Sequence, residues 1–302
     1  MTTQLSAPTP VGQQVPEKQG IYRKRALESL SKLPPFSPIL SKLMASLAGE
    51  DVSFMVLGEL IEKDAVVAAN IMRVVNSALY ARRGTISSVR HALTVLGLEK
   101  VRNTVLAMSI SRMMNQAKTP PGWSMENFNK HSAAVAMMSD LLAQNVKTDY
   151  GEGAFVAGLL HDIGRLLIAM GLPAEFHAIQ QRHRSSGLPW RECELEALGF
   201  HHACLSGDAM TDWKLPEPIR LAVLDHHDPP QVVFAAPVPL SCIIHAANNY
   251  VNARGLTIME EPLTGRQDPA LALSTLPIKE DVAARVIAQF ETEHSAIAQF
   301  YN

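Results

Sequence analysis

Residues 158–170 read GLLHDIGRLLIAM, and this stretch carries the strongest structural signal in the chain. The titratable pair His161–Asp162 lies inside an otherwise apolar, helix-like run. Burying a carboxylate beside an imidazole costs several kcal/mol unless something pairs with them. A metal ion, a bound substrate or the two side chains themselves must therefore supply that pairing.

Helical periodicity dominates the rest of the chain, and the alternating pattern of strands is scarce. Over residues 64–80 we expect a helix with Asp64 as its N-cap. Its apolar face would consist of Val67, Ile71, Val74 and Ala78. Residues 87–97, SSVRHALTVLG, begin with capping serines and end at Gly97, a residue suited to a helix C-terminus. The chain is therefore predicted to be all-α.

A Pro-Pro-Gly cluster within QAKTPPGW, residues 116–123, divides the helical pattern into two lobes. Residues 1–20 form a polar leader that we expect to be disordered. The first lobe would occupy residues 21–118, and the second, which ends in a C-terminal helix, residues 119–302. Residues 153–170 are expected to form one helix of the second lobe.

Composition narrows the class of protein. The chain has 302 residues, 47% of them hydrophobic and 19% charged, with a net charge of −2, as in an ordinary soluble globular protein. Without an excess of Lys and Arg, nucleic acid is not an expected partner. No apolar run approaches the ~18–20 residues of a membrane span, and the N-terminus has no secretory signal, so no membrane association is expected. Three cysteines without CxxC spacing fit a reducing cytoplasm.

Histidines concentrate in the second lobe, where nine of the eleven lie between positions 131 and 245. Metal-capable side chains occur there at five places: His131, His161–Asp162, His201–His202, His226–His227 with Asp225 and Asp228, and His245. Imidazoles with one or two carboxylates suit Zn, Fe, Mn or Ni better than Ca or Mg. A transition metal is therefore the expected cofactor, if the protein has one.

Each histidine also has a simpler interpretation. Lone residues such as His177, His183 and His245 are more often hydrogen-bonded core or surface residues than metal ligands. The doublet His201–His202 taken alone favours a solvated helix end, because spacing without geometry is weak evidence. For His161–Asp162 a structural pair and a metal or catalytic site are equally good interpretations, since a buried pair must be satisfied by something.

Several segments together resemble a known family. A histidine on one helix (HSAAVAMMSDLLA), an HD dipeptide on another (FVAGLLHDIGRLLI) and a later histidine doublet (LAVLDHHDPP) are similar to the HD superfamily of metal-dependent phosphohydrolases. Over residues 25 to 255 the chain more specifically resembles the HDOD domain, a bacterial signalling relative of the HD-GYP phosphodiesterases. The resemblance implies an all-α fold with an N-terminal helical bundle packed on a C-terminal HD-like helical bundle.

The same resemblance implies a set of site residues. Its metal positions fall on His131, His161, Asp162, His202, His226 or His227, and Asn248. At Asn248 a true HD hydrolase would have an aspartate, so an anionic ligand is replaced by a neutral one. No GYP sequence follows HHDPP, although a cyclic-di-GMP phosphodiesterase would carry one.

Arg165 lies four residues after His161, one helical turn along the same face, and could contact a phosphate or end an amphipathic surface stripe. We therefore expect a bacterial signal-transduction regulatory module without hydrolase activity, which has a possible metal pocket and engages signalling proteins. The alternative is a metal-dependent phosphohydrolase that acts on a nucleotide or cyclic dinucleotide. Such activity would need the charge of a metal ion, an activated water and phosphate-clamping cations together.

Overall fold

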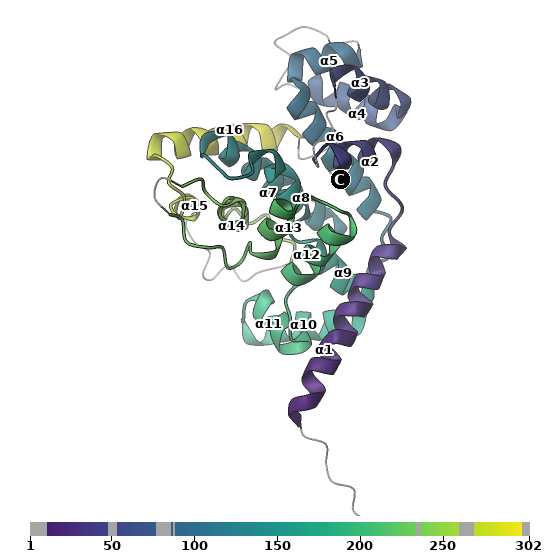
Figure 1. Cartoon of the computed structure of the whole chain (residues 1–302), viewed down its shortest axis with the longest axis vertical. Coiled ribbons are helices and arrows are strands. Elements are labelled where there is room, and N and C mark those ends of the chain that lie inside the picture. The colour runs from purple at the N-terminus through teal and green to yellow at the C-terminus, as the bar shows by residue number, and fades with distance from the viewer. Residues whose placement is uncertain are drawn as a thin grey trace, which may run out of the picture.

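The structure is a computed structural model that describes residues 11–47, 53–76, 86, 88–233, 236–259 and 269–297. Within these ranges the chain is helical and contains no strand, only one isolated bridge between Thr148 and Val238. The all-α prediction is confirmed. The helices form two groups, with α3, α4 and α5 at one end of the molecule in Figure 1.

The first group contains the helices of residues 38–114, before the Pro-Pro-Gly segment. Their bounds are α2 (Pro38–Ser46), α3 (Phe54–Lys63), α4 (Ala65–Val75), α5 (Val89–Leu96) and α6 (Leu98–Met114). The Asp64 carboxylate accepts hydrogen bonds from the backbone N–H groups of Val66 and Val67, as expected for the N-cap of α4. Val67, Ile71 and Val74 are buried on the predicted face, whereas Ala78 lies outside the described residues.

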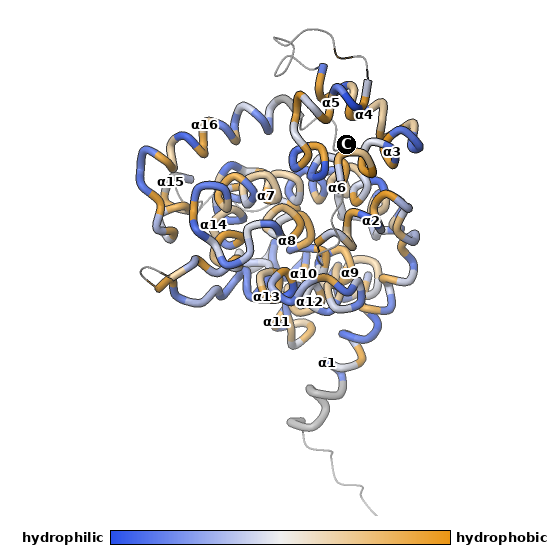
Figure 2. The backbone as a smooth tube through the Cα atoms, turned by 45° about the horizontal axis from the view of Figure 1, so that its top comes forward, coloured by the Kyte–Doolittle hydropathy of each residue, from blue (hydrophilic) through white to orange (hydrophobic). Residues whose placement is uncertain are grey.

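The second group surrounds α7 and α8. Its bounds are α7 (Met125–Asn145), α8 (Ala154–Leu160), α9 (Ile163–Gly171), α10 (Pro173–Ser186), α11 (Trp190–Leu198), α12 (His202–Asp212), α13 (Glu217–Leu224), α14 (Leu240–Ala253), α15 (Pro269–Ala272) and α16 (Glu280–Ile297). In Figure 2 the hydrophobic stretches gather in the interior on α7, α8 and α9, whereas α16 carries hydrophilic stretches. Gly158 lets α8 approach α7 closely, since a Cβ there would lie 2.8 Å from the Cα of Ala136.

Helix α1 (Val11–Glu28) runs beside the second group and is not part of the first (Figure 1). Gln19 donates a hydrogen bond to the carbonyl of Gly199, and Arg23 forms a two-pronged ion pair with Asp208 on α12. These contacts hold a helix that begins at Val11, although the sequence predicts a disordered leader up to residue 20. Residues 1–10 of that leader lie outside the described residues.

The helix expected over residues 153–170 is interrupted, so that prediction is wrong in detail. Helix α8 ends at Leu160, and α9 begins at Ile163 after Asp162, whose backbone angles are φ −103° and ψ 13°. The expectation that no apolar run approaches the length of a membrane span is wrong, because the run Gly151–Gly171 could cross a membrane by length and composition. However, 94% of its apolar 18-residue window is buried inside the protein. It forms the core of the second group. The break falls at the His161–Asp162 pair. These two side chains therefore do not have to point ~100° apart, as neighbours on one regular helix do.

Candidate metal centre

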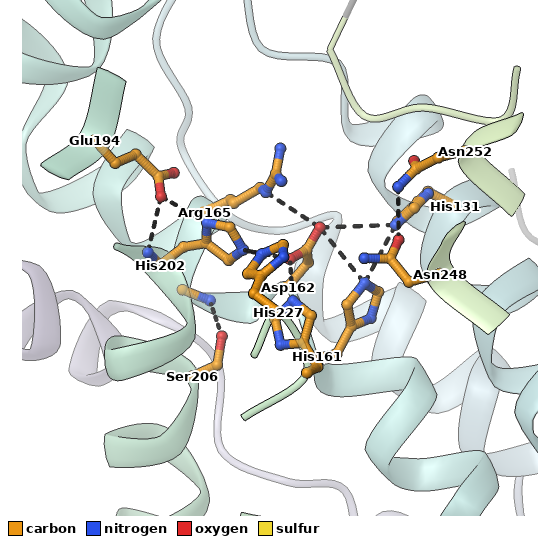
Figure 3. Close-up of polar contacts among 12 residues, drawn as sticks. His131, His161, Asp162, Arg165, Glu194, His202, Ser206, His227, Asn248 and Asn252 are labelled. Atoms are coloured by element: carbon orange, nitrogen blue, oxygen red, sulfur yellow. Dashed lines mark hydrogen bonds and ion pairs between the residues drawn. The ribbon is translucent and has the colours of Figure 1, made fainter. Parts of the chain in front are cut away.

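Six titratable side chains from four parts of the second group meet in the protein interior (Figure 3). They are His131 on α7, His161 and Asp162 at the α8–α9 break, His202 at the start of α12, and His226 and His227 directly after α13. All except His227 have an exposed fraction of 2% or less, and His227 is partly buried. Five of the six side chains thus lie at the helix break or at a helix end, where they converge with His131 from within α7.

Asp162 is the centre of the arrangement. One carboxylate oxygen, Oδ2, faces His131 and His161 at Nε2 distances of 3.7 and 3.5 Å. The other, Oδ1, lies 2.9 Å from Nε2 of His202 and 3.6 Å from Nε2 of His226. Two groups of ligand atoms, each within 4.8 Å of one another, therefore share this carboxylate: His131, His161 and Asp162, and Asp162, His202, His226 and His227.

Hydrogen bonds outside the cluster orient its imidazoles. The Nδ1 atoms of His131, His161 and His226 lie 2.7 Å from the backbone carbonyls of Leu256, Gly158 and Val223, respectively. A carbonyl only accepts, so each Nδ1 carries the proton and each neutral ring turns an unprotonated Nε2 toward Asp162. Outer hydrogen bonds of this kind are typical of metal-binding histidines.

These tautomers test whether the residues fit a cation. The Nε2 atoms of His131 and His161 lie 3.3 Å apart, and neither has a proton to donate to the other. The buried Nε2 of His226 has no hydrogen-bond partner among the described residues. Unprotonated nitrogens that face one another around a carboxylate are satisfied by a cation between them. This set of ligand atoms therefore fits a metal ion.

The pKa values follow the same electrostatics. Burial alone would raise the pKa of Asp162, but Arg165, His161 and His202 hold it well below its usual range. Burial lowers the pKa of His131 to about 4, and it also lowers the pKa of His161 and of His226. At neutral pH the centre therefore contains an ionised Asp162 and neutral imidazoles at His131, His161 and His226, the forms that bind metal.

Glu194 on α11 is a site residue that the sequence reasoning missed. It has 0% exposure, and its Oε2 accepts hydrogen bonds from Nδ1 and from the backbone N–H of His202, at 2.6 and 2.9 Å. Burial lowers the pKa of His202, but Glu194 and Asp162 more than offset this and the net shift is upward. WRECELEALGF reads as an ordinary amphipathic helix, so the sequence gives no signal for this contact.

A cavity of about 610 Å³ opens beside the cluster. Arg165, His227 and Asn248 line it, together with Trp190 and Arg191. Arg165 places Nε 3.1 Å from Asp162 Oδ2, and its side chain is only 10% exposed, so the surface-stripe interpretation does not hold. Asn248 is buried on α14, and its side-chain oxygen accepts a hydrogen bond from Asn252.

The remaining candidate histidines lie in different environments, and not all of them belong to the cluster. His202 is fully buried in the cluster, so the solvated-end interpretation of the doublet is wrong for it, whereas its neighbour His201 is the N-cap residue of α12. His245 lies outside both groups of ligand atoms, between the carbonyl of His226 and the amide of Asn249. His183 is a buried core residue that contacts the carbonyl of Leu188.

Comparison with known proteins identifies the class. The HDOD domain family model matches residues 33–229, and the chain belongs to that family. An HDOD domain protein of unknown function from Geobacter sulfurreducens superimposes with a TM-score of 0.70 at 22% identity, over 93% of this chain and 96% of that one. A structure from Marinobacter aquaeolei VT8, provisionally named a signal transduction protein, gives 0.70 at 19% identity over 98% and 67%. The TM-scores establish the shared fold.

Two further relatives complete the comparison. A structure from Shewanella amazonensis SB2B, provisionally named a phosphohydrolase, has a TM-score of 0.69 at 21% identity and covers 92% of this chain and 98% of that one. An uncharacterized protein of Treponema pallidum (strain Nichols) is 21% identical over 282 residues. The match covers 89% of this chain and 52% of that protein, so the chain spans about half the length of this curated relative.

Proposed function

We propose that this HDOD protein is a bacterial signal-transduction module, acting in the cytoplasm on signalling proteins, whose HD-like centre binds a pair of transition-metal ions. The observation that carries the proposal is the Asp162 carboxylate shared by two groups of inward-facing imidazoles. His131 and His161 would hold one ion, and His202, His226 and His227 the other, with Asp162 between them. Bound iron, manganese, zinc or nickel would supply Lewis acidity and an activated water.

Asn248 is the reason to prefer regulation over hydrolysis. A neutral amide in place of the expected carboxylate removes one anionic ligand and one acceptor of protons, and its oxygen is already engaged by Asn252. The metal centre would then serve as a ligand-sensing element that stabilises one arrangement of α8, α9, α12 and α13. Partner proteins would respond to that arrangement.

A metal-dependent phosphohydrolase is the second candidate, and the cavity beside the centre favours it. Arg165 and Arg191 both line the cavity, so cations are present where an anionic substrate would enter. The substrate in this case would be a nucleotide or cyclic dinucleotide, whose phosphate would meet Arg165 and the metal pair together.

Turnover decides between the two. The metal-loaded protein is incubated with bis(p-nitrophenyl) phosphate beside the His161→Ala/Asp162→Ala variant, and metal content is measured on the same samples. The regulatory proposal predicts bound metal in the parent and no release of p-nitrophenol above the variant. Release by the parent that disappears in the variant would instead establish the phosphohydrolase. His177→Ala, an exposed histidine on α10, is the matched control.

A further inference from the structure

A second cavity, of about 410 Å³, lies between the two helical groups and away from the metal centre. Its lining comes from the α5–α6 junction and from α7, α8 and α16. Both polar and apolar residues take part. Leu98, Met137, Leu141 and Phe155 give it apolar walls, and Glu99, Asp140 and Glu293 bring three carboxylates to it.

The charges in this cavity are unbalanced. Lys100 on α6 lines it too and lies 2.7 Å from Glu293 on α16, which ties the two helical groups together. Arg102, also on α6, lies 4.0 Å from Glu99 but is not among the lining residues. Above about pH 7, where Asp140 is ionised, three carboxylates face these two positive side chains among the described residues. The cavity therefore favours an additional positive charge.

Asn103 provides an independent sign that something is missing. It lines the cavity and is 5% exposed, and its side chain hydrogen-bonds the carboxylate of Asp140. Because the ionised carboxylate of Asp140, its form above about pH 7, only accepts, the Asn103 amide group donates, and its oxygen Oδ1 has no partner among the described residues. A buried acceptor beside carboxylates calls for a donor, which an ammonium group supplies.

A single metal ion does not suit this cavity. Within the described part of the chain, the groups whose ligand atoms lie within 4.8 Å of one another are the two histidine groups around Asp162. The carboxylates of Glu99, Asp140 and Glu293 are more widely spaced. They also differ in depth, since the Glu99 side chain is 60% exposed and that of Glu293 is 14% exposed. Separated acceptors joined by apolar walls match a cation with two charged ends and an alkyl chain.

We propose that the cavity between α6, α7 and α16 binds an alkyl diammonium ligand of the polyamine class, with one ammonium at Asp140 and Asn103 and the other toward Glu99. Such a ligand would join α6 of the first group to α7 and α16 of the second. Burial and the neighbouring Glu99 and Glu293 raise the pKa of Asp140 to about 7, and a bound ammonium would favour its ionised form.

Titration calorimetry with 1,4-diaminobutane at about pH 8, where Asp140 is ionised, tests this site. The 302-residue chain should bind the diamine saturably, one per chain, and Asp140→Asn should weaken binding roughly tenfold or more, as for a lost ion pair in a cavity. Glu126→Gln, an exposed position on the same helix, should leave affinity unchanged. Asn at position 140 removes a poorly solvated charge, so the variant is expected to fold.

Three outcomes would overturn the proposal. The first is a heat signal no larger than that of sodium chloride at the same ionic strength. The second is equal affinity for butylamine, which mimics a lysine side chain, or for Mg²⁺, because then a second ammonium contributes nothing. The third is a diamine affinity that Asp140→Asn does not change.

Discussion

Glu194 holds His202 through two hydrogen bonds. The same carboxylate oxygen, Oε2, accepts from Nδ1 of the imidazole at 2.6 Å and from the backbone N–H at 2.9 Å. Both residues have 0% exposure. The bond leaves Nε2 of His202 to face Asp162, so a residue on α11 determines the orientation of a proposed metal ligand on α12.

Glu194→Gln should therefore weaken metal binding while the fold is retained. A neutral amide orients the ring less firmly and makes it less basic, and loss of such an outer partner typically costs about 10–100-fold in metal affinity. Competition with a chromophoric chelator measures the change. Glu217→Gln, at an exposed glutamate on α13, is the control and should leave affinity unaltered. Equal affinities for the parent and Glu194→Gln would remove Glu194 from the site.

Gly164 sets the distance between α9 and α12. A Cβ at this position would lie 2.0 Å from the carbonyl oxygen of His202, a backbone atom that cannot move aside. Gly164→Ala should lower the free energy of unfolding by about 3 kcal/mol or more. Gly207→Ala on α12 is the matched control, because its Cβ would meet Leu224 at 3.5 Å, an ordinary contact. Similar denaturation midpoints for the two variants would contradict this packing.

Asp140 should make stability depend on pH. Its pKa is raised from 3.8 to about 7 by burial first and by Glu99 and Glu293 next, so the native state holds a proton that the unfolded state has lost. The contribution of Asp140 is thus present below the unfolded pKa and is lost as pH rises toward 7. Asp140→Asn should stabilise the protein increasingly over this window, by up to about 4 kcal/mol. Urea denaturation at a series of pH values checks this, and a stabilisation that does not vary with pH would be inconsistent with it.

Arg165 should contribute to anion binding at the metal centre. Its guanidinium lies against Asp162 and lines the neighbouring cavity. Arg165→Met should weaken pyrophosphate binding to the metal-loaded protein roughly tenfold, as for loss of one charge-assisted contact. Arg191→Met is the comparison, because Arg191 lines the same cavity and pairs with Asp228, not with the proposed metal-binding carboxylate of Asp162. A larger loss in Arg191→Met, measured by calorimetry, would reassign the anion contact.

Local signals in the sequence predict much of the fold. The N-cap at Asp64, the buried face of α4 and the end of α5 at Gly97, which has φ +86°, all follow from patterns within a few residues. The apolar run around His161 correctly predicts a buried pair. The interruption between α8 and α9 is not visible there, because residues 159–163, LLHDI, contain no glycine or proline that would mark a break.

The residues of the candidate site are likewise only partly predictable from the sequence. Sequence reasoning names all six members of the cluster, since histidines and an HD pair are conspicuous by residue type. Glu194 and Gly164 are not predicted from the sequence, because their roles depend on contacts with His202. These contacts arise only when α9 and α11 pack on α12. The helical start of α1 is not predicted for a similar reason, since its partners Gly199 and Asp208 are far away in sequence.

The central claim is that Asp162 holds cations between two groups of histidines, and metal stoichiometry tests it most directly. Parent protein, Asp162→Asn and the control His177→Ala are loaded with Mn²⁺ or Fe²⁺ under identical conditions, desalted, and analysed by mass spectrometry of the elements. Two metal ions per chain are expected in the parent and the control, and almost none in Asp162→Asn. A parent without metal, or an Asp162→Asn variant that keeps the parent's content, would contradict it.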